Sequence, residues 1–496
     1  MGGDTHVCVC SESEKCDGEL EHLNHVSKEH GKVTSFVSSK AGSRLAQHSH
    51  QFTQNKPSEH FNLEIDINHG KKYQKIIGFG GAFTDSTGNQ IGRLSRALQG
   101  RLINDYFGYD GIEYRLGRVT IGGSDFSTRE YSLDDHPHDE SLSTFALQNE
   151  DYNYKMPFMR WAREVTKHPN ELKFFGTAWS SPAWMKTNKQ LNHGGFLRGH
   201  PGGKYYESFA QYMVRFLQEY KKNNVSIWGL TIVNEPGFGN DPNFRYNCLG
   251  FTAQTQRDYI KLDLGPTLHK NGFGNVAVLH YDHNIDHLEE YANTILGDHD
   301  AAKYVAGTAY HWYERYNNKY NRTILRHIAE RYPDKILLST EGCLGYRRST
   351  SLGDWNNFNE YADDIVKVLN EGVQGWVDWN MVLDMNGGPS WAGTVVDAPI
   401  HVSDDAKEYY KLPLYYAMGH FSKFIVPNSV KTHIDVRRDG NGNNIEIVAF
   451  ERPDKSMVLT VLNKNNHKIN MKVHDPKRGY LVVNMAANSM DSLIWY

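Results

Sequence analysis

An alternation of strand-like and helix-length segments through the middle of the chain constrains the fold most strongly. Eight short runs rich in β-branched and aromatic residues are each followed by a segment long enough for a helix. They lie at 76–79, 114–119, 173–178, 228–233, 276–279, 305–310, 336–340 and 373–378. Eight such units are the number that closes a parallel barrel, so we predict an α/β fold containing a (β/α)8 TIM barrel.

The intervening segments support this interpretation. Apolar residues recur every three or four positions between 205 and 220, and again between 355 and 369. That spacing is typical of helices that pack one apolar face on a barrel wall.

The ends of the chain show the alternating pattern of strands with one buried face. It occurs at 61–67 and returns at 445–450, 457–462, 469–473 and 480–483, with a polar turn at 439–444. We expect a discontinuous all-β sandwich from 29–75 and 430–496 around a catalytic barrel at 76–429, and a small β segment from 1–28 with about 382–412. Residues 25–60, rich in Ser, Lys and His, are expected to be loosely ordered.

Two of the eight runs end directly in a glutamate. Glu235 follows the fourth run and precedes Pro236, and Glu341 follows the seventh run and precedes a glycine. Active sites of (β/α)8 barrels lie at the carboxyl ends of the strands, so the two acids are expected to face each other across the mouth. One such glutamate more often caps a helix or pairs with an arginine. Two in these positions favour the paired carboxylates of a glycosidase.

Other polar and aromatic residues at strand ends fit a sugar site. Aspartates can accept hydrogen bonds from sugar hydroxyls, and tryptophans can cover the apolar face of a pyranose. The candidates are Asp85, Asp125, Trp179, Asp282, His311, Tyr313 and Trp379, although each alone could be an ordinary loop residue. Arg118, inside the second run, needs a buried carboxylate partner, for which Glu341 and Glu235 are the candidates.

Composition and motifs exclude several function classes. Charged residues make up 23% of the chain and the net charge is −4, which argues against a nucleic-acid partner. No apolar run approaches the about 20 residues of a transmembrane span. The first residues lack the pattern of a signal peptide, so this start is expected to be mature or trimmed.

No cofactor or metal is predicted. The glycines at 78–81 lack the lysine of a phosphate-binding loop, and no Gly-x-Ser-x-Gly motif of a serine esterase is present. The pairs His136 with His138 and His280 with His283 lack zincin spacing, and 25 histidines make such pairs easy to find by chance.

Cysteines and sequons favour an oxidising compartment. Cys8, Cys10 and Cys16 crowd into the first sixteen residues, a spacing that suits a disulfide better than a zinc site, the weaker alternative. Cys248 and Cys343 are expected to be free thiols. Asn224 and Asn321 are acceptors for glycosylation if the protein is secreted.

Several longer motifs, taken in order, identify a resemblance that covers nearly the whole chain. They lie at 7–10, 78–82, 180–184, 234–236, 311–313, 376–379, 387–389 and 419–424. With these motifs the chain resembles the lysosomal acid β-glucosidase family, whose members are also called glucocerebrosidases or glucosylceramidases.

The resemblance implies a retaining β-glucosidase with Glu235 as acid/base and Glu341 as nucleophile. It implies glucosylceramide as substrate, with a saposin-like activator and anionic lipid as helpers in the lysosomal lumen. Around the glucose it places Asp125, Trp179, Asn234 and Trp379, with His311 and Tyr313 beside the nucleophile. The sequence departs from the family at Thr394, where an Asn is usual, in the aromatics of 244–246, and in lacking one amino-terminal cysteine.

Retention predicts carboxyl groups about 5 Å apart, whereas a gap near 9 Å would indicate inversion. Two alternatives stay open. One is a related barrel that cleaves a β-xyloside or a β-1,6-glucan. The other, less favoured, is a catalytically silent carbohydrate-binding barrel.

Overall fold

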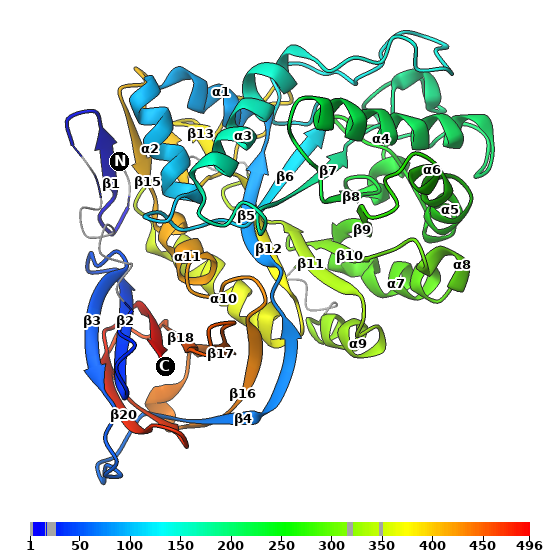
Figure 1. Ribbon diagram of the computed structural model, residues 1–496. Helices are drawn as coiled ribbons and strands as arrows, with labels where there is room; N and C mark the ends of the chain where they lie inside the picture. Colours follow the sequence, from blue (N-terminus) through cyan, green and yellow to red (C-terminus); the bar gives the residue numbers. More distant parts are fainter. Residues whose placement is uncertain (1–2, 15, 17–25, 315–320, 347–350) are drawn as a thin grey trace.

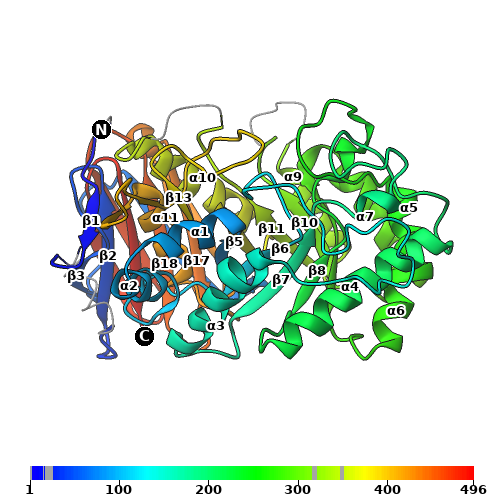
Figure 2. The same ribbon diagram turned by 90° about the horizontal axis from the view of Figure 1, so that it is seen from above.

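The computed structural model describes residues 3–14, 16, 26–314, 321–346 and 351–496. Three sheets organise this part of the chain: a closed barrel, a nine-stranded sheet and a four-stranded sheet. Figures 1 and 2 show the barrel beside the nine-stranded sheet, with both chain ends on the side away from the barrel.

The barrel consists of eight parallel strands in a closed ring, as the sequence predicts. Each predicted run overlaps one strand. The strands are β5 (Gly78–Phe83), β6 (Leu116–Ile121), β7 (Lys173–Ala178), β8 (Gly229–Thr231), β9 (Ala277–Asn284), β10 (Gly307–His311), β11 (Ile336–Glu341) and β12 (Gly375–Asn380).

Helices surround the barrel. The two segments with helical periodicity are α4 and α10, and their apolar residues are buried. The helices are α1 (Asp85–Arg93), α2 (Arg96–Phe107), α3 (Met156–Val165), α4 (Lys204–Lys222), α5 (Ala253–Tyr259), α6 (Gly265–Lys270), α7 (Leu288–Leu296), α8 (His299–Ala302), α9 (Thr323–Arg331), α10 (Trp355–Asn370) and α11 (Pro413–Ser422).

A layer of apolar side chains fills the barrel interior. Its members come from six different strands and are all fully buried: Leu116, Phe175, Leu279, Ala309, Leu338 and Val377. Burying a large apolar side chain contributes about 1.5–3 kcal/mol, so this layer is a substantial part of the barrel core. Polar groups at the strand ends therefore meet above a packed core rather than in an open channel.

The nine-stranded sheet combines both ends of the chain, as predicted for the discontinuous sandwich. Its order is β20-β19-β4-β16-β17-β18-β21-β2-β3, and a bridge between Thr53 and Tyr480 brings its two ends together, so the sheet curls around its own core. The strands are β2 (Lys32–Ser39), β3 (Ala46–Gln51), β4 (Leu63–Lys75), β16 (Val430–Arg438), β17 (Ile445–Glu451), β18 (Met457–Asn463), β19 (Ile469–Asp475), β20 (Gly479–Met485) and β21 (Ser489–Trp495).

The expectation of loose order across 25–60 is wrong for most of that stretch. Strand β2 pairs with β21 on one side and with β3 on the other, and the buried Phe36 belongs to the core. The Ser, Lys and His residues that suggested disorder are spread over β2, the edge strand β3 and the adjoining loops, and three of them, Ser35, Ser38 and Ser39, are buried in β2.

The amino-terminal residues join a small four-stranded sheet. Strand β1 (Cys8–Ser11) pairs antiparallel with β15 (Glu408–Lys411), which continues through β14 (Ile400–Val402) to β13 (Val382–Asp384). Cys10 and Cys16 form a disulfide. Cys8 is half-buried. The exact bounds of the three predicted domains remain predictions.

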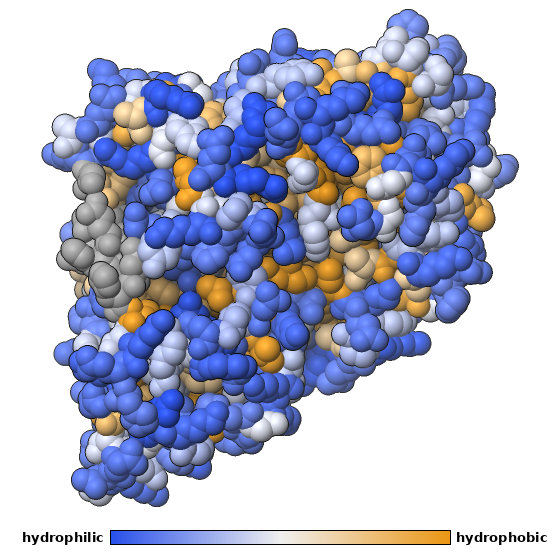
Figure 3. Space-filling view, in the orientation of Figure 1, coloured by the Kyte–Doolittle hydropathy of each residue, from blue (hydrophilic) through white to orange (hydrophobic). Residues whose placement is uncertain are grey.

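The face of the molecule shown in Figure 3 is mostly hydrophilic, and its apolar residues show most continuously across the middle. Asn224 and Asn321 are both exposed. Among the residues that the structure describes, no helix combines the length and apolar character needed to cross a bilayer.

Candidate active site

Glu235 stands at the carboxyl end of β8, in an unusual backbone conformation. Its φ of 48° and ψ of 60° are left-handed, and the short helical turn Pro236–Asn240 begins directly after it. The following proline disfavours the right-handed helical region, and the backbone N–H of Glu235 donates to the carbonyl of Asp282 at 2.9 Å. A non-glycine residue in this region costs about 1–3 kcal/mol, and such strain is concentrated at functional sites.

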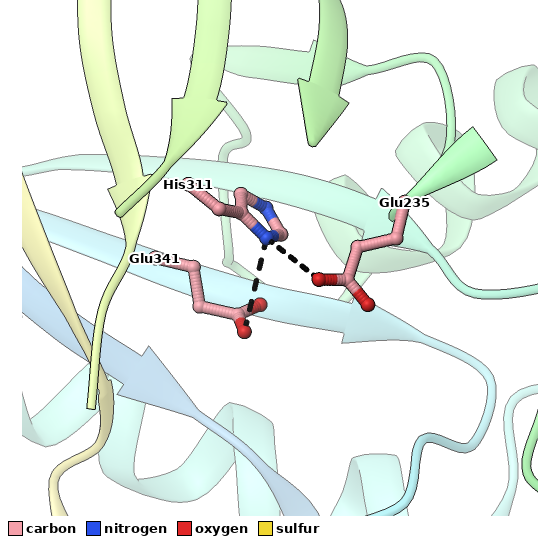
Figure 4. Close-up of side chains that lie close together, drawn as sticks. All are labelled: Glu235, His311 and Glu341. Carbon is pink, nitrogen blue, oxygen red and sulfur yellow. Dashed lines mark hydrogen bonds and ion pairs between the residues drawn. The ribbon is translucent and has the colours of Figure 1, made fainter. Parts of the chain in front are cut away.

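Glu341 is the last residue of β11 and faces Glu235 across the barrel mouth. Figure 4 shows the imidazole of His311 beside both carboxylates. The Nδ1 atom lies 3.2 Å from Oε1 of Glu235 and 3.9 Å from Oε1 of Glu341. One oxygen of each glutamate and one His311 nitrogen lie within 4.8 Å of one another. Oxygens this close are in keeping with the about 5 Å expected between the carboxyl groups of a retaining enzyme.

Fixed donors hold both oxygens of Glu341. Nη1 of Arg118 donates to Oε2, and the Tyr313 hydroxyl donates to Oε1 at 2.7 Å. Nη2 of Arg118 also donates to Asn234 and to Asp282, each at 2.9 Å. Arg118 therefore has the buried carboxylate partner that the sequence analysis expects.

The electrostatics of the site favour a charged His311. Burial by itself lowers the pKa of this imidazole, but the carboxylates of Glu341 and Asp282 outweigh it and raise the pKa to about 9. For Asp282 burial acts in the other direction and raises the pKa, but the positive charges of Arg118 and His311 outweigh it and hold the pKa of Asp282 well below its usual range.

Asp125 differs from Asp282, because its surroundings raise its pKa. Burial, followed by the charges of Glu341 and Glu235, raises its pKa well above the usual value. Asp125 therefore lies near both glutamates and is favoured in its protonated form, in which it can donate as well as accept a hydrogen bond.

Aromatic rings line the site. Trp179 and Trp379 stack with centroids 5.1 Å apart, and the Arg118 guanidinium lies 4.8 Å from the first ring centre and 5.4 Å from the second. Both tryptophans and Phe126 share one apolar cluster, with Tyr313 packed against it. Thus Asp125, Trp179, Asn234, His311, Tyr313 and Trp379 gather around the glutamates, while their roles toward a substrate stay predictions.

Two residues proposed for the sugar site are not free to bind a sugar. Asp85 is fully buried and binds Ser127, Tyr131 and Lys155, with no contact to either glutamate. Asp282 is also fully buried and is engaged by protein donors, so it cannot accept from a sugar hydroxyl. The sequence analysis correctly placed both aspartates near the ends of barrel strands. The sequence does not reveal which hydrogen-bond donors surround each side chain.

Sequence reasoning also missed two residues. Thr231 and Thr340 donate to Asp282 at 2.7 and 2.6 Å. The available signal was a polar residue within a predicted buried strand, in the fourth run for Thr231 and at the end of the seventh for Thr340. The half-buried Tyr246 lies close enough to the site that Glu235, Asp125 and Glu341 add to the burial that raises its pKa.

Glu235, His311 and Glu341 are close enough together to surround a cation. In this site His311 is favoured as an imidazolium, whose two ring nitrogens both carry protons and offer no lone pair. In this protonation state the three groups are equipped for proton transfer.

Comparisons with known proteins agree with the fold and show the family. Residues 76–425 match the glycosyl hydrolase family 30 TIM-barrel domain, and residues 432–493 match the family 30 beta sandwich domain. A putative glucosylceramidase 3 of Caenorhabditis elegans is 38% identical, covering 99% of this chain and 92% of the relative. The mouse lysosomal acid glucosylceramidase is 36% identical, covering 100% of this chain and 94% of the relative.

A solved structure of the endo-β1,6-glucanase BT3312 is 26% identical, with a TM-score of 0.81 over 94% of this chain and 99% of that one. The protein is therefore a glycoside hydrolase that belongs to glycosyl hydrolase family 30.

Proposed function

We propose that this enzyme is a retaining β-glucosidase that hydrolyses glucosylceramide to glucose and ceramide by double displacement. The observation that carries the proposal is the spacing of the two glutamates, which brings an oxygen of each within 4.8 Å. Such a gap lets one carboxylate reach the anomeric carbon while the other reaches the glycosidic oxygen. The glucosylceramidase relatives support the choice of substrate.

In the first step, a carboxylate oxygen of Glu341 attacks the anomeric carbon. The bond from that carbon to the leaving oxygen breaks, and Glu235 gives this oxygen its proton. In the second step, Glu235 takes a proton from water, the water oxygen bonds to the anomeric carbon, and the ester to Glu341 breaks. Two inversions return the β configuration.

The proposed glucose pocket uses the surrounding residues in different ways. Trp179 and Trp379 supply rigid apolar walls, and a protonated Asp125 can bind a sugar hydroxyl in either direction. The side-chain oxygen of Asn234 accepts from Arg118, so its amide group is left to donate to a hydroxyl. Bonds of that kind strengthen in the transition state.

The cellular setting is part of the same proposal. The mouse relative supports action in the lysosomal lumen, at a membrane surface with anionic lipid and a saposin-like activator. The exposed Asn224 and Asn321 would then be available for glycosylation.

Substrate rates test the proposal directly. We expect hydrolysis of fluorescent glucosylceramide, stimulated by anionic vesicles, and of an aryl β-glucoside, with little activity on aryl β-xyloside. The product first formed, observed by proton NMR, should be β-glucose. The similarity to a β-1,6-glucanase makes pustulan, a β-1,6-glucan, the rival substrate. Faster turnover of pustulan would replace the substrate assignment, and no turnover of any glycoside would favour a silent barrel.

A further inference from the structure

Asp282 has an unusual position between the two catalytic glutamates. It is fully buried, and its Oδ1 accepts from His311 Nε2 at 3.0 Å while its Oδ2 accepts from Arg118 at 2.9 Å. Its backbone carbonyl accepts the N–H of Glu235. Asp282 therefore reaches Glu341 through Arg118, and reaches Glu235 through both His311 and its own backbone.

Two irregularities in the barrel aim these groups inward. In the ladder between β9 and β10, Ala309 pairs with Tyr281 and Tyr310 with His283, so Asp282 is an extra residue, with a left-handed φ of 68°. A β-bulge of this kind re-aims a side chain and is common beside active sites.

A second bulge lies on the next ladder. Between β10 and β11, Tyr310 pairs with Ser339 and His311 with Glu341, which leaves Thr340 as the extra residue. Its hydroxyl donates to Oδ1 of Asp282 at 2.6 Å. With these two bulges, the side chains of Thr340 and His311 both contact the carboxylate of Asp282.

The charges of this buried group balance when His311 is cationic and one glutamate is ionised. Arg118 and Asp282 cancel each other. The retaining mechanism starts with one glutamate ionised and the other protonated, and a cationic His311 neutralises that remaining negative charge. Without the charge of Asp282, a protonated His311 would leave an uncompensated positive charge in a buried site.

We propose that Asp282 is a positioning residue that keeps His311 in its imidazolium form, so that one ring N–H serves whichever glutamate is ionised during the cycle. This inference rests on the proposed function, because it assigns a task within the double displacement. In the first step the negative charge passes from Glu341 to Glu235. The Nδ1 atom of His311 lies 3.2 Å from one and 3.9 Å from the other, so a small shift lets it follow the charge.

The surroundings of His311 support this assignment. The groups around it that titrate or carry charge are Glu235, Asp282, His283, Glu341, Arg118 and Tyr313. The nearby His283 is buried and has its pKa lowered to about 4 by burial and by His311, so it stays neutral when His311 is charged. Asp282 is thus the permanently ionised neighbour on the Nε2 side of the ring.

The first test observes His311 in the wild-type protein. Its ring signals, assigned by their loss in His311→Gln, should titrate by NMR well above the ordinary value, near pH 9. Titration near pH 6.5 would overturn the inference, whatever the enzyme's activity.

The second test removes the charge and keeps the shape. In Asp282→Asn the His311 titration and the alkaline limb of kcat/KM on an aryl β-glucoside should both move down by about one to three pH units. Asp85→Asn is the matched control, because Asp85 is equally buried in an ion pair but does not contact the glutamates. Asp85→Asn should leave both the His311 titration and the alkaline limb of kcat/KM unchanged.

Each outcome separates the two proposals. The inference is overturned if the alkaline limb of kcat/KM does not move in Asp282→Asn, or if it moves equally far in Asp85→Asn. A wild type without β-glucosidase activity would overturn the proposed function, while the NMR titrations would still decide the role of Asp282. If Asp282→Asn does not fold, a wild-type titration of His311 near pH 6.5 still overturns the inference.

Discussion

The hydroxyl of Tyr313 donates a 2.7 Å hydrogen bond to Oε1 of Glu341. With Arg118 on the other oxygen, it fixes the plane of the carboxylate that the proposed mechanism uses as nucleophile. A hydrogen bond to a charged group contributes about 1.5–3 kcal/mol. Catalysis is therefore expected to depend on a residue that does no covalent chemistry.

Replacing Tyr313 by Phe removes this hydroxyl and keeps the ring. We expect kcat on an aryl β-glucoside to fall by about 10- to 100-fold, since each 1.36 kcal/mol corresponds to a factor of ten in rate. Steady-state kinetics with thermal denaturation as a folding control measure this. A kcat within twofold of wild type would show that the bond does not matter for the reaction.

The acid/base assignment predicts a dependence on the leaving group. Glu235→Gln cannot donate a proton, so the cleavage of substrates with poor leaving groups should slow by about 10²- to 10⁴-fold. A dinitrophenyl β-glucoside, whose leaving group needs no proton, should retain fast release of dinitrophenol in the first turnover. Equal losses on both substrates would argue against this role of Glu235.

The charge on His311 also predicts a pH dependence of stability. Its pKa of about 9 lies above the ordinary value of 6.5, so the stabilisation by its protonated form is complete below about pH 6.5. It is lost as the pH rises through about 9. The whole window corresponds to about 3 kcal/mol, at 1.36 kcal/mol for each pH unit.

His311→Gln cannot carry this charge and provides the comparison. The difference in free energy of unfolding between wild type and variant should shrink from pH 6 to pH 9.5. Denaturant titrations across that range measure it. A difference that stays constant would contradict a charged His311 in the folded protein.

The packed interior of the barrel predicts a large effect on stability. Leu338 is fully buried in the central layer, and truncation to Ala should cost about 2–5 kcal/mol through lost burial and a cavity. Leu262→Ala is the control, because Leu262 is 52% exposed and should change stability by less than about 0.5 kcal/mol. Equal losses of unfolding free energy in the two variants would contradict the expected contribution of this layer to stability.

Much of the fold was predictable because parallel barrel strands are buried on both faces. The run that became β11 therefore begins with three apolar residues in succession, without the alternation of a half-exposed strand, and is recognised easily. Strands β16 and β21 were missed for two different reasons. One is largely polar and partly exposed, and the other includes the buried Asp491, whose charge type suggests a surface residue.

The site was predictable in position but not in orientation. Glu235 and Glu341 were found because a strand end places a residue at the mouth whatever the detailed backbone. Asp282 was misread as a sugar-binding residue because a bulge turns it toward Arg118 and His311. A bulge breaks the period-two rule for side-chain direction, and no residue pattern marks this one.

Covalent trapping tests the central claim, that Glu341 attacks the substrate with Glu235 at its side. Incubation with a β-glucose-configured cyclitol epoxide should add one inhibitor mass per chain, and peptide mapping should place it on Glu341. Glu341→Gln should gain no mass. A label on another residue, or sustained glucoside hydrolysis by Glu341→Gln, would contradict the account.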